Sequence, residues 1–127
     1  MKKIFVYIGI FCTVAILFVK CSKQTEDGIM YNYYFNTHWA NLEDSIKAEN
    51  YLKPKKIAKT TVFNDNVQNT DQQAIELFNE LLSQISIAEL NDLHLEPTSS
   101  FTYAVSRWQN PHNPYSGTII IKSFTYP

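Results

Sequence analysis

The chain has 127 residues, of which 45% are hydrophobic and 18% charged, with a formal net charge of −1. This length and composition predict one small globular domain and exclude a long disordered chain or a multidomain protein. Lys2, Lys3 and Lys20 lie in the first 20 residues, which leaves eight basic residues against twelve acidic ones in the remainder. The acidic remainder argues against nucleic acid as a partner.

The first 20 residues have the composition of a membrane-targeting segment. Residues 4–19 form an uncharged, largely apolar run behind Lys2 and Lys3. A helix of about 16 residues spans roughly 24 Å, which is short for a hydrocarbon core of about 30 Å. Residues 1–20 are therefore expected to be either a signal peptide or a transmembrane anchor, and the membrane is the first expected partner.

Cys21, which follows this run, bears on the choice between the two. A basic start, an apolar middle and then a cysteine resemble the export signal of bacterial lipoproteins. The resemblance implies that Cys21 is lipidated and becomes the new N-terminus. Lys20 stands where that signal has a small residue, so an uncleaved anchor and a cleaved soluble product remain as alternatives. The charges of Lys2 and Lys3 place a membrane-anchored body on the periplasmic or exterior side.

Residues 21–35 are expected to form a tether and an aromatic lead-in to a small α+β domain over residues 36–127. The aromatic residues 29–36 fit a strand, because alternate positions are β-favouring and apolar. They also fit the start of one long helix, because a stripe of period 3.6 continues beyond them. We leave this segment open between strand and helix.

A helix is predicted from about Thr37 to Asn50, with the longer alternative beginning at about Gly28. Pro54 restricts the residue before it to extended geometry and so ends this helix. Residues 56–63 then predict a strand, because β-branched and aromatic residues dominate before an Asn-Asp-Asn turn.

A basic stretch runs from this helix into this strand. We expect it to be a solvated face, with binding of an anionic lipid headgroup as the functional alternative. The stretch consists of Lys47, Lys53, Lys55, Lys56 and Lys59.

The next helix has the clearest pattern in the chain. Thr70 and Gln73 have the spacing of a capping box, which predicts a helix start. From Ala74 to Ala88 apolar residues recur at intervals of three and four, so one face is expected to pack on a sheet. The capping-box spacing recurs at Ser86, which predicts that the helix restarts there.

Residues 101–108 and 118–126 predict two strands joined by a turn-rich connection, which makes a C-terminal β-hairpin. The elements together predict an α+β fold in which two main helices pack on an antiparallel sheet, behind an N-terminal membrane-targeting segment. The hairpin connection exceeds the usual two to five residues and contains Trp108, His112 and Tyr115. These three residues are the candidate partner-binding surface, and the alternative is a turn whose aromatics cover the sheet edge.

No residue pattern predicts a particular reaction. The chain has only three glycines, which excludes a P-loop and a dinucleotide fingerprint. No cysteine follows Cys21, so the body lacks a thiol nucleophile and a cysteine-based zinc site. His94, Glu96 and His112 are the best available metal-binding set, but we interpret them as surface residues and predict no metal or cofactor.

The sequence therefore favours a small, membrane-tethered accessory or binding protein of the bacterial envelope rather than an enzyme. An inhibitor, an immunity-type protein or an assembly component, each with a protein partner, fits this description. The alternative is a small envelope hydrolase that uses His38, His94 or His112 as a base. Two histidines and a carboxylate in one pocket would favour that alternative.

Overall fold

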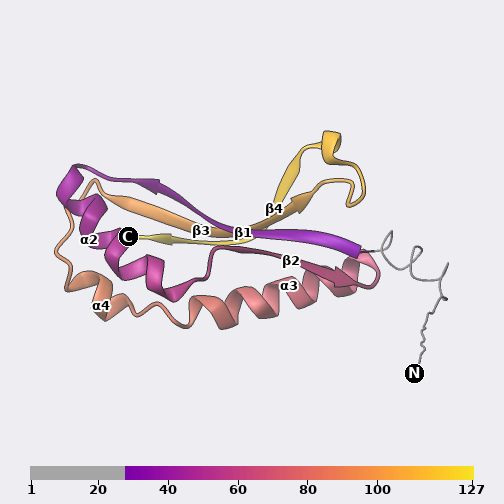
Figure 1. The fold of residues 1–127 in the computed structure, drawn as a ribbon, viewed down its shortest axis with the longest axis horizontal. Coiled ribbons are helices and arrows are strands. Elements are labelled where there is room, and N and C mark those ends of the chain that lie inside the picture. Colours follow the sequence, from indigo (N-terminus) through magenta and orange to yellow (C-terminus); the bar gives the residue numbers. More distant parts are fainter. Residues whose placement is uncertain (1–27) are drawn as a thin grey trace, which may run out of the picture.

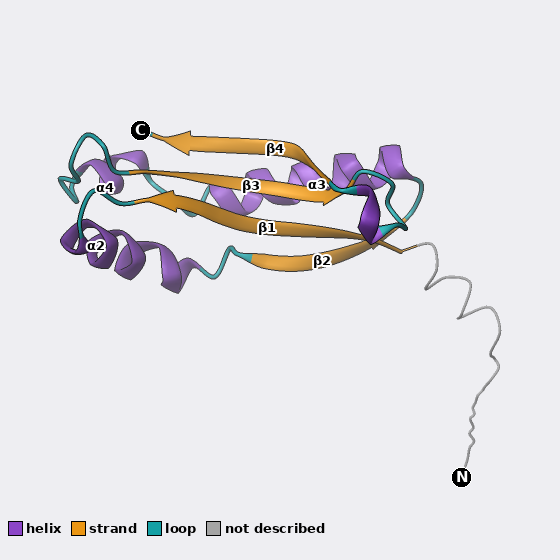
Figure 2. Ribbon diagram, turned by 90° about the horizontal axis from the view of Figure 1, so that it is seen from above, coloured by secondary structure: helices purple, strands orange, loops and turns teal. Residues whose placement is uncertain are grey.

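A computed structural model describes residues 28–127, so the predicted targeting segment and Cys21 lie outside the described residues. Four antiparallel strands form one sheet in the order β2-β1-β3-β4, and helices cover one face of it (Figures 1 and 2). This confirms the predicted α+β class with an antiparallel sheet and a C-terminal hairpin. The strands are β1 (Gly28–His38), β2 (Lys59–Asn64), β3 (Ser100–Trp108) and β4 (Thr118–Tyr126).

Three helices and two short 3-10 turns complete the described part. Helix α3 runs beneath the sheet, whereas α2 and α4 lie at the end of the sheet remote from the β3–β4 connection (Figure 1). No helix within residues 28–127 has the length and apolar character needed to cross a membrane. The elements are α2 (Leu42–Leu52), η1 (Lys53–Lys55), α3 (Val67–Leu82), α4 (Ile87–Asn91) and η2 (Pro114–Ser116).

β1 is a central strand, paired with β2 on one side and with β3 on the other. Residues 28–35, which the sequence assigned to a tether and lead-in, are therefore part of the sheet, and the boundary at residue 36 is wrong. The strand alternative for this segment is confirmed and the long helix from Gly28 is excluded. Ile29, Tyr31 and Tyr33 are at most 3% exposed, because alternate residues point toward the helices.

Helix α2 begins later than the sequence predicted, because β1 continues through Thr37 to His38. The helix starts after Asn41, whose side chain accepts a hydrogen bond from the Asp44 backbone N–H at 2.8 Å. An Asn at this position satisfies one of the free amides of the first turn. The N-terminus of α2 is therefore fixed by a local cap that our pattern analysis did not use.

Helix α3 also has a different cap from the predicted one. Asn66 is the N-cap, and its side chain accepts a hydrogen bond from the Asn69 backbone N–H at 2.9 Å. The capping box at Thr70 is wrong, because Thr70 is buried inside the helix with its hydroxyl 2.7 Å from the Tyr31 hydroxyl. The Thr70 side chain therefore contacts Tyr31 of β1 and does not cap the helix.

The predicted apolar face of α3 is confirmed. Ala74, Phe78 and Leu81 are buried against the sheet, with Leu81 the most exposed of the three at 8%. The predicted restart is confirmed as well, because Ser86 caps α4 by accepting from the Glu89 backbone N–H at 3.3 Å.

The core between α3 and the sheet contains buried tyrosine rings whose hydroxyls are hydrogen-bonded. Phe78 stacks on Tyr103 with ring centroids 5.0 Å apart. The Tyr103 hydroxyl donates to the carbonyl of Ile57 at 2.6 Å, and that of Tyr33 donates to the carbonyl of Ala74 at 2.9 Å. Tyrosine can therefore fill this core without leaving a buried donor unpaired.

A buried carboxylate holds α2 to the segment that precedes β3. Asp44 accepts hydrogen bonds from the Ser99 hydroxyl at 2.6 Å and from the Glu96 backbone N–H at 2.9 Å. These two hydrogen bonds lower the pKa of Asp44, which therefore remains charged at neutral pH. The Ser99 oxygen in turn accepts from the Ala40 backbone N–H at 2.8 Å, so the end of β1 and the start of β3 are linked here.

Candidate functional site

The β3–β4 connection, residues 109–117, rises from the sheet on the side opposite the helices (Figure 1). We call this segment the hairpin tip. A 3-10 turn, η2, lies within it. No α-helix of residues 28–127 covers this side of the sheet, so we call it the open face (Figure 1).

Arg107, at the end of β3, connects the hairpin tip to α3. Its Nε donates to Asp71 Oδ1 at 2.8 Å and its Nη2 to Asp71 Oδ2 at 3.0 Å, which is a bidentate ion pair. Its Nη1 donates to the carbonyls of Trp108 and Gln109 at 3.0 and 3.1 Å. One guanidinium therefore fixes the start of the hairpin tip against a helix on the other face of the sheet.

The protonation states of Asp71 and Tyr31 indicate a structural role for their cluster with Arg107. Burial acts to raise the pKa of Asp71, but hydrogen bonds from Arg107 and Tyr31 outweigh it and lower that pKa below its ordinary value. Burial, and the hydrogen bond to Asp71, raise the pKa of Tyr31 to about 12. The carboxylate is therefore charged and the phenol neutral at pH 7, so neither group is poised to exchange a proton.

The hairpin tip is held in shape by its own side chains. Asn113 Oδ1 accepts from the Tyr115 backbone N–H at 2.9 Å, and Ser116 Oγ accepts from the Asn110 backbone N–H at 2.9 Å. Gly117 has a φ of 87°, which favours glycine, and closes the loop. Local hydrogen bonds of this kind give a long loop one preferred conformation before any partner arrives.

The three predicted binding residues lie on or beside the hairpin tip but do not line one cavity. Tyr115 is 94% exposed, and no described residue covers it. Trp108 is half-buried on the open face of the sheet, where it lines a hollow of about 310 Å³ with Met30 and Thr60. His112 lines a different cavity, near the start of β1.

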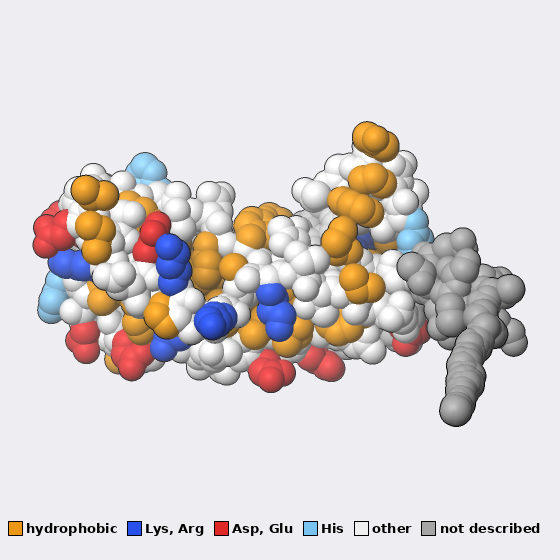
Figure 3. Space-filling model, viewed as in Figure 1, with side chains coloured by type: hydrophobic (Ala, Val, Ile, Leu, Met, Phe, Trp, Pro, Cys, Tyr) orange, Lys and Arg blue, Asp and Glu red, His pale blue; other side chains and the backbone are white. Residues whose placement is uncertain are grey.

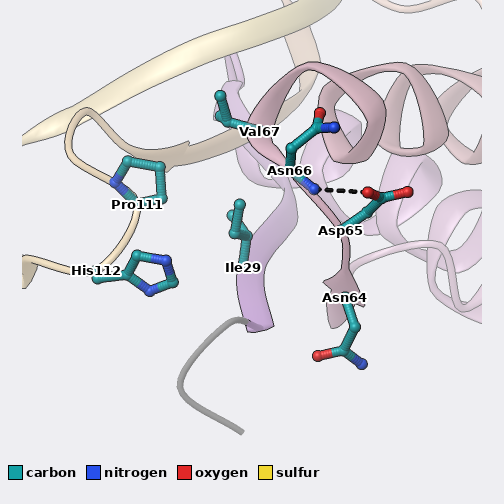
Figure 4. A pocket seen from close by; sticks show the side chains of 7 residues that line it. All are labelled: Ile29, Asn64, Asp65, Asn66, Val67, Pro111 and His112. Carbon is teal, nitrogen blue, oxygen red and sulfur yellow. Dashed lines mark hydrogen bonds between the residues drawn. The ribbon is translucent and has the colours of Figure 1, made fainter. Parts of the chain in front are cut away.

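The cavity beside His112 has a volume of about 870 Å³ and lies between the β2–α3 turn and the hairpin tip (Figure 4). Its carboxylate, Asp65, already accepts hydrogen bonds from the Asn66 backbone N–H at 2.7 Å and from Asn69 Nδ2 at 3.2 Å. The polar groups of this cavity thus serve the cap of α3. They do not form a constellation that would activate His112.

The other two histidines lie far from this cavity. His38 ends β1 and His94 follows α4, at the opposite end of the domain from the hairpin tip (Figure 1). The described residues therefore bring no two histidines together with a carboxylate. Residues 28–127 contain no group of three histidines and acidic residues suited to a metal ion, so His94, Glu96 and His112 are not assembled.

Pattern analysis missed a row of exposed apolar side chains on the open face. Met30, Val62 and Ile120 are 38%, 53% and 59% exposed. Met30 pairs with Val62 across β1 and β2, and Met30 also borders Trp108, so the row crosses the sheet below the hairpin tip. We call Met30, Val62, Trp108 and Ile120 the open-face patch. The outward position of Met30 follows from the alternation of residues along β1, but this could be used only once that segment was assigned to a strand.

No protein-family model, curated protein or solved structure matches the chain. We therefore base the functional conclusion on the hairpin tip and the open-face patch.

Proposed function

We propose that this chain is a non-enzymatic, membrane-tethered binding protein of the bacterial envelope that holds a protein partner on its hairpin tip and open-face patch. The partner relationship would be that of an inhibitor, an immunity-type protein or an assembly component. The observation that carries this proposal is Tyr115, which is 94% exposed on a loop fixed by its own hydrogen bonds.

A rigid loop with an exposed tyrosine is well suited to binding a protein. Tyrosine is enriched among the residues that dominate interface energetics, because it supplies a large contact area and one polar atom. The loop hydrogen bonds at Asn113 and Ser116 reduce the entropy lost when the hairpin tip is ordered on a partner. The open-face patch adds apolar area directly below, of the kind that marks interaction sites when contiguous.

The position of the hairpin tip relative to the chain start supports a partner near the membrane. Gly28 and the hairpin tip lie at the same end of the domain (Figures 1 and 2). Eight residues separate Val19 from Gly28, and eight extended residues reach at most roughly 29 Å. An anchor in residues 4–19, or a lipid on Cys21, would therefore keep the hairpin tip close to the periplasmic or exterior membrane surface.

The proposal is tested by placing a photocrosslinking amino acid at position 115 of the full-length chain in intact bacteria. We expect one dominant adduct with a single protein, whose identity mass spectrometry would give. The matched control is position 42, because Leu42 is also a large exposed apolar residue, at 75%, but starts α2 at the far end. An adduct at position 115 and none at position 42 is the expected result.

A second measurement separates binding from folding. Tyr115→Ala should lower capture of the cross-linked protein from solubilised envelopes by at least about tenfold, since such aromatics contribute about 2 kcal/mol or more. Its melting temperature should stay close to that of Leu42→Ala, because neither side chain is packed in the core. Equal adducts at positions 115 and 42, or unchanged capture by Tyr115→Ala, would remove the hairpin tip as the partner surface.

A further inference from the structure

A second cavity, of about 590 Å³, lies at the end of the domain remote from the hairpin tip, between α2, η1 and the entry to β2. Its walls are mainly apolar and include Phe35, Trp39, Leu52 and Ile57. The volume falls inside the range of about 300 to 1,000 Å³ that is usual for small-molecule sites. The cavity takes side chains from three separate segments of the chain, so it is a product of the tertiary fold.

The border of this apolar cavity is basic. Lys53 and Lys56 line it, and Lys59 follows at the start of β2. Within residues 28–127 none of these lysines takes part in an ion pair. Basic side chains surround apolar ones over the junction of α2 and β2 in Figure 3. The acid at this border is Glu49, which is exposed and accepts a weak hydrogen bond from Ser45 at 3.5 Å.

A further feature indicates a ligand with an acceptor group. Trp39 lines the cavity, and its indole Nε1 is buried with no hydrogen-bond partner among the described residues. A buried donor without a partner is uncommon, because the lost hydrogen bonds to water are not replaced.

We propose that this cavity binds an anionic amphiphile with a single acyl chain. The acyl chain would lie against Phe35, Leu52 and Ile57, since these side chains offer no polar partner. The head group, a carboxylate or a phosphate, would lie between Lys53 and Lys56, whose positive charges have no other partner in residues 28–127. This site is separate from the hairpin tip. In this proposal the basic stretch forms the border of a binding cavity and is not only a solvated face.

The test is photoaffinity labelling of the full-length chain in zwitterionic nanodiscs, with diazirine-bearing palmitic acid as the probe. We expect the label to map by mass spectrometry to the peptides that contain Trp39 and Leu52. Unlabelled palmitate should compete, and hexadecanol, which has the same chain and no charge, should not. A parallel arm with lysophosphatidic acid as competitor distinguishes a phosphate head from a carboxylate, and preferential competition by either one supports the site.

Variants then assign the effect to named groups. Lys53→Gln combined with Lys56→Gln should lower labelling by about tenfold or more, since each lysine near an anionic head contributes on the order of 1 kcal/mol. Trp39→Phe, which keeps an aromatic ring and removes the N–H, should lower it to a smaller extent. Lys122→Gln, on β4, is the matched control and should change nothing.

Three outcomes would overturn the proposal. They are labelling that maps outside the cavity, equal competition by hexadecanol and palmitate, and full labelling of the double lysine variant. The melting temperature of each variant must be recorded, and a variant that does not fold is replaced by Ala58→Trp. Ala58 is exposed at the cavity wall, so a bulky side chain there should block the probe while the core remains intact.

Discussion

Arg107 and Asp71 form a bidentate ion pair, and its contribution to stability depends on how far the two side chains are buried. The Arg107 side chain is 10% exposed and that of Asp71 is 26% exposed, so solvent screens the pair less than it screens a surface ion pair. Each Asp71 oxygen accepts from Arg107, and Oδ1 also accepts from Tyr31. Removing this acceptor would leave a largely buried guanidinium and a phenol without their partner.

Asp71→Asn should destabilise the protein by about 1 to 3 kcal/mol at pH 7, because a charged acceptor of three hydrogen bonds is replaced by a neutral one. The folded-state pKa of Asp71 lies below its unfolded value of about 3.9. The carboxylate therefore contributes its full stabilisation above the unfolded pKa and loses it as the pH falls through the folded pKa. In urea unfolding, the difference in unfolding free energy between wild type and Asp71→Asn should therefore narrow as the pH falls below the unfolded pKa.

Asp92→Asn is the control for this experiment, because Asp92 is exposed and its carboxylate forms no hydrogen bond or ion pair among residues 28–127. Its unfolding free energy should match that of wild type at each pH. A gap for Asp71→Asn that stays constant with pH would show that the loss does not come from the carboxylate charge.

The elements of this fold differ in how far the sequence determines them. Helix α3 and the β3–β4 hairpin could be predicted because the periodicity of their apolar residues is strong and unambiguous. β1 could not be decided, since its aromatic residues satisfy both a period of two and a period of 3.6. Pairing with β2 and β3 on both sides selects the strand, and those partners are distant in sequence.

The starts of the helices also show that local sequence patterns do not reveal long-range contacts. Thr70 and Gln73 match a capping box in sequence, but the Thr70 hydroxyl is taken by Tyr31 and Asn66 caps the helix instead. A local motif carries no information about a competing long-range contact. The Ser86 side chain caps α4 as the same motif predicted, but the Ser86 backbone N–H donates to the Tyr51 hydroxyl at 2.9 Å, so a long-range contact replaces the other half of the capping box.

A pair of substitutions on α3 tests whether its buried face stabilises the domain as the packing implies. Leu81→Ala should cost about 2 to 5 kcal/mol, because it removes a side chain that is 8% exposed and leaves a cavity. Glu80→Ala, the adjacent exposed residue, should cost under about 0.5 kcal/mol. Denaturant unfolding of both variants measures the difference, and similar costs would contradict the assignment of the two faces.

At the scale of the whole molecule, the candidate sites lie at two opposite ends. The hairpin tip was within reach of sequence analysis, because Trp108, His112 and Tyr115 are close in the chain and their loop is long. The amphiphile cavity was not, because Phe35, Leu52 and Ile57 come together only when β1 and α2 are placed. The lysines at its border were visible in the sequence, but the apolar walls behind them were not.

Because the start of β1 and the hairpin tip lie at the same end of the domain, the orientation of the domain on the membrane can be predicted. If residues 4–19 or a lipid on Cys21 anchors the chain, at most roughly 29 Å of extended chain separates the anchor from β1. The hairpin tip should then face the bilayer, and α4 and the amphiphile cavity should lie farther from it (Figure 2). The same geometry holds whether the anchor is a helix or a lipid.

Depth-dependent fluorescence quenching can measure this orientation on the full-length chain in liposomes. A fluorescent amino acid at exposed position 112, in the hairpin tip, should be quenched by lipids that carry a quencher in the head group. The same amino acid at exposed position 92, directly after α4, should be quenched much less, because it lies at the opposite end of the domain. Cys21→Ala should abolish both signals if the lipid is the anchor and leave them unchanged if the apolar helix is retained. Equal quenching at positions 112 and 92 in the wild-type chain would mean that the domain has no fixed orientation on the membrane. The position of the hairpin tip would then no longer support a partner at the membrane surface.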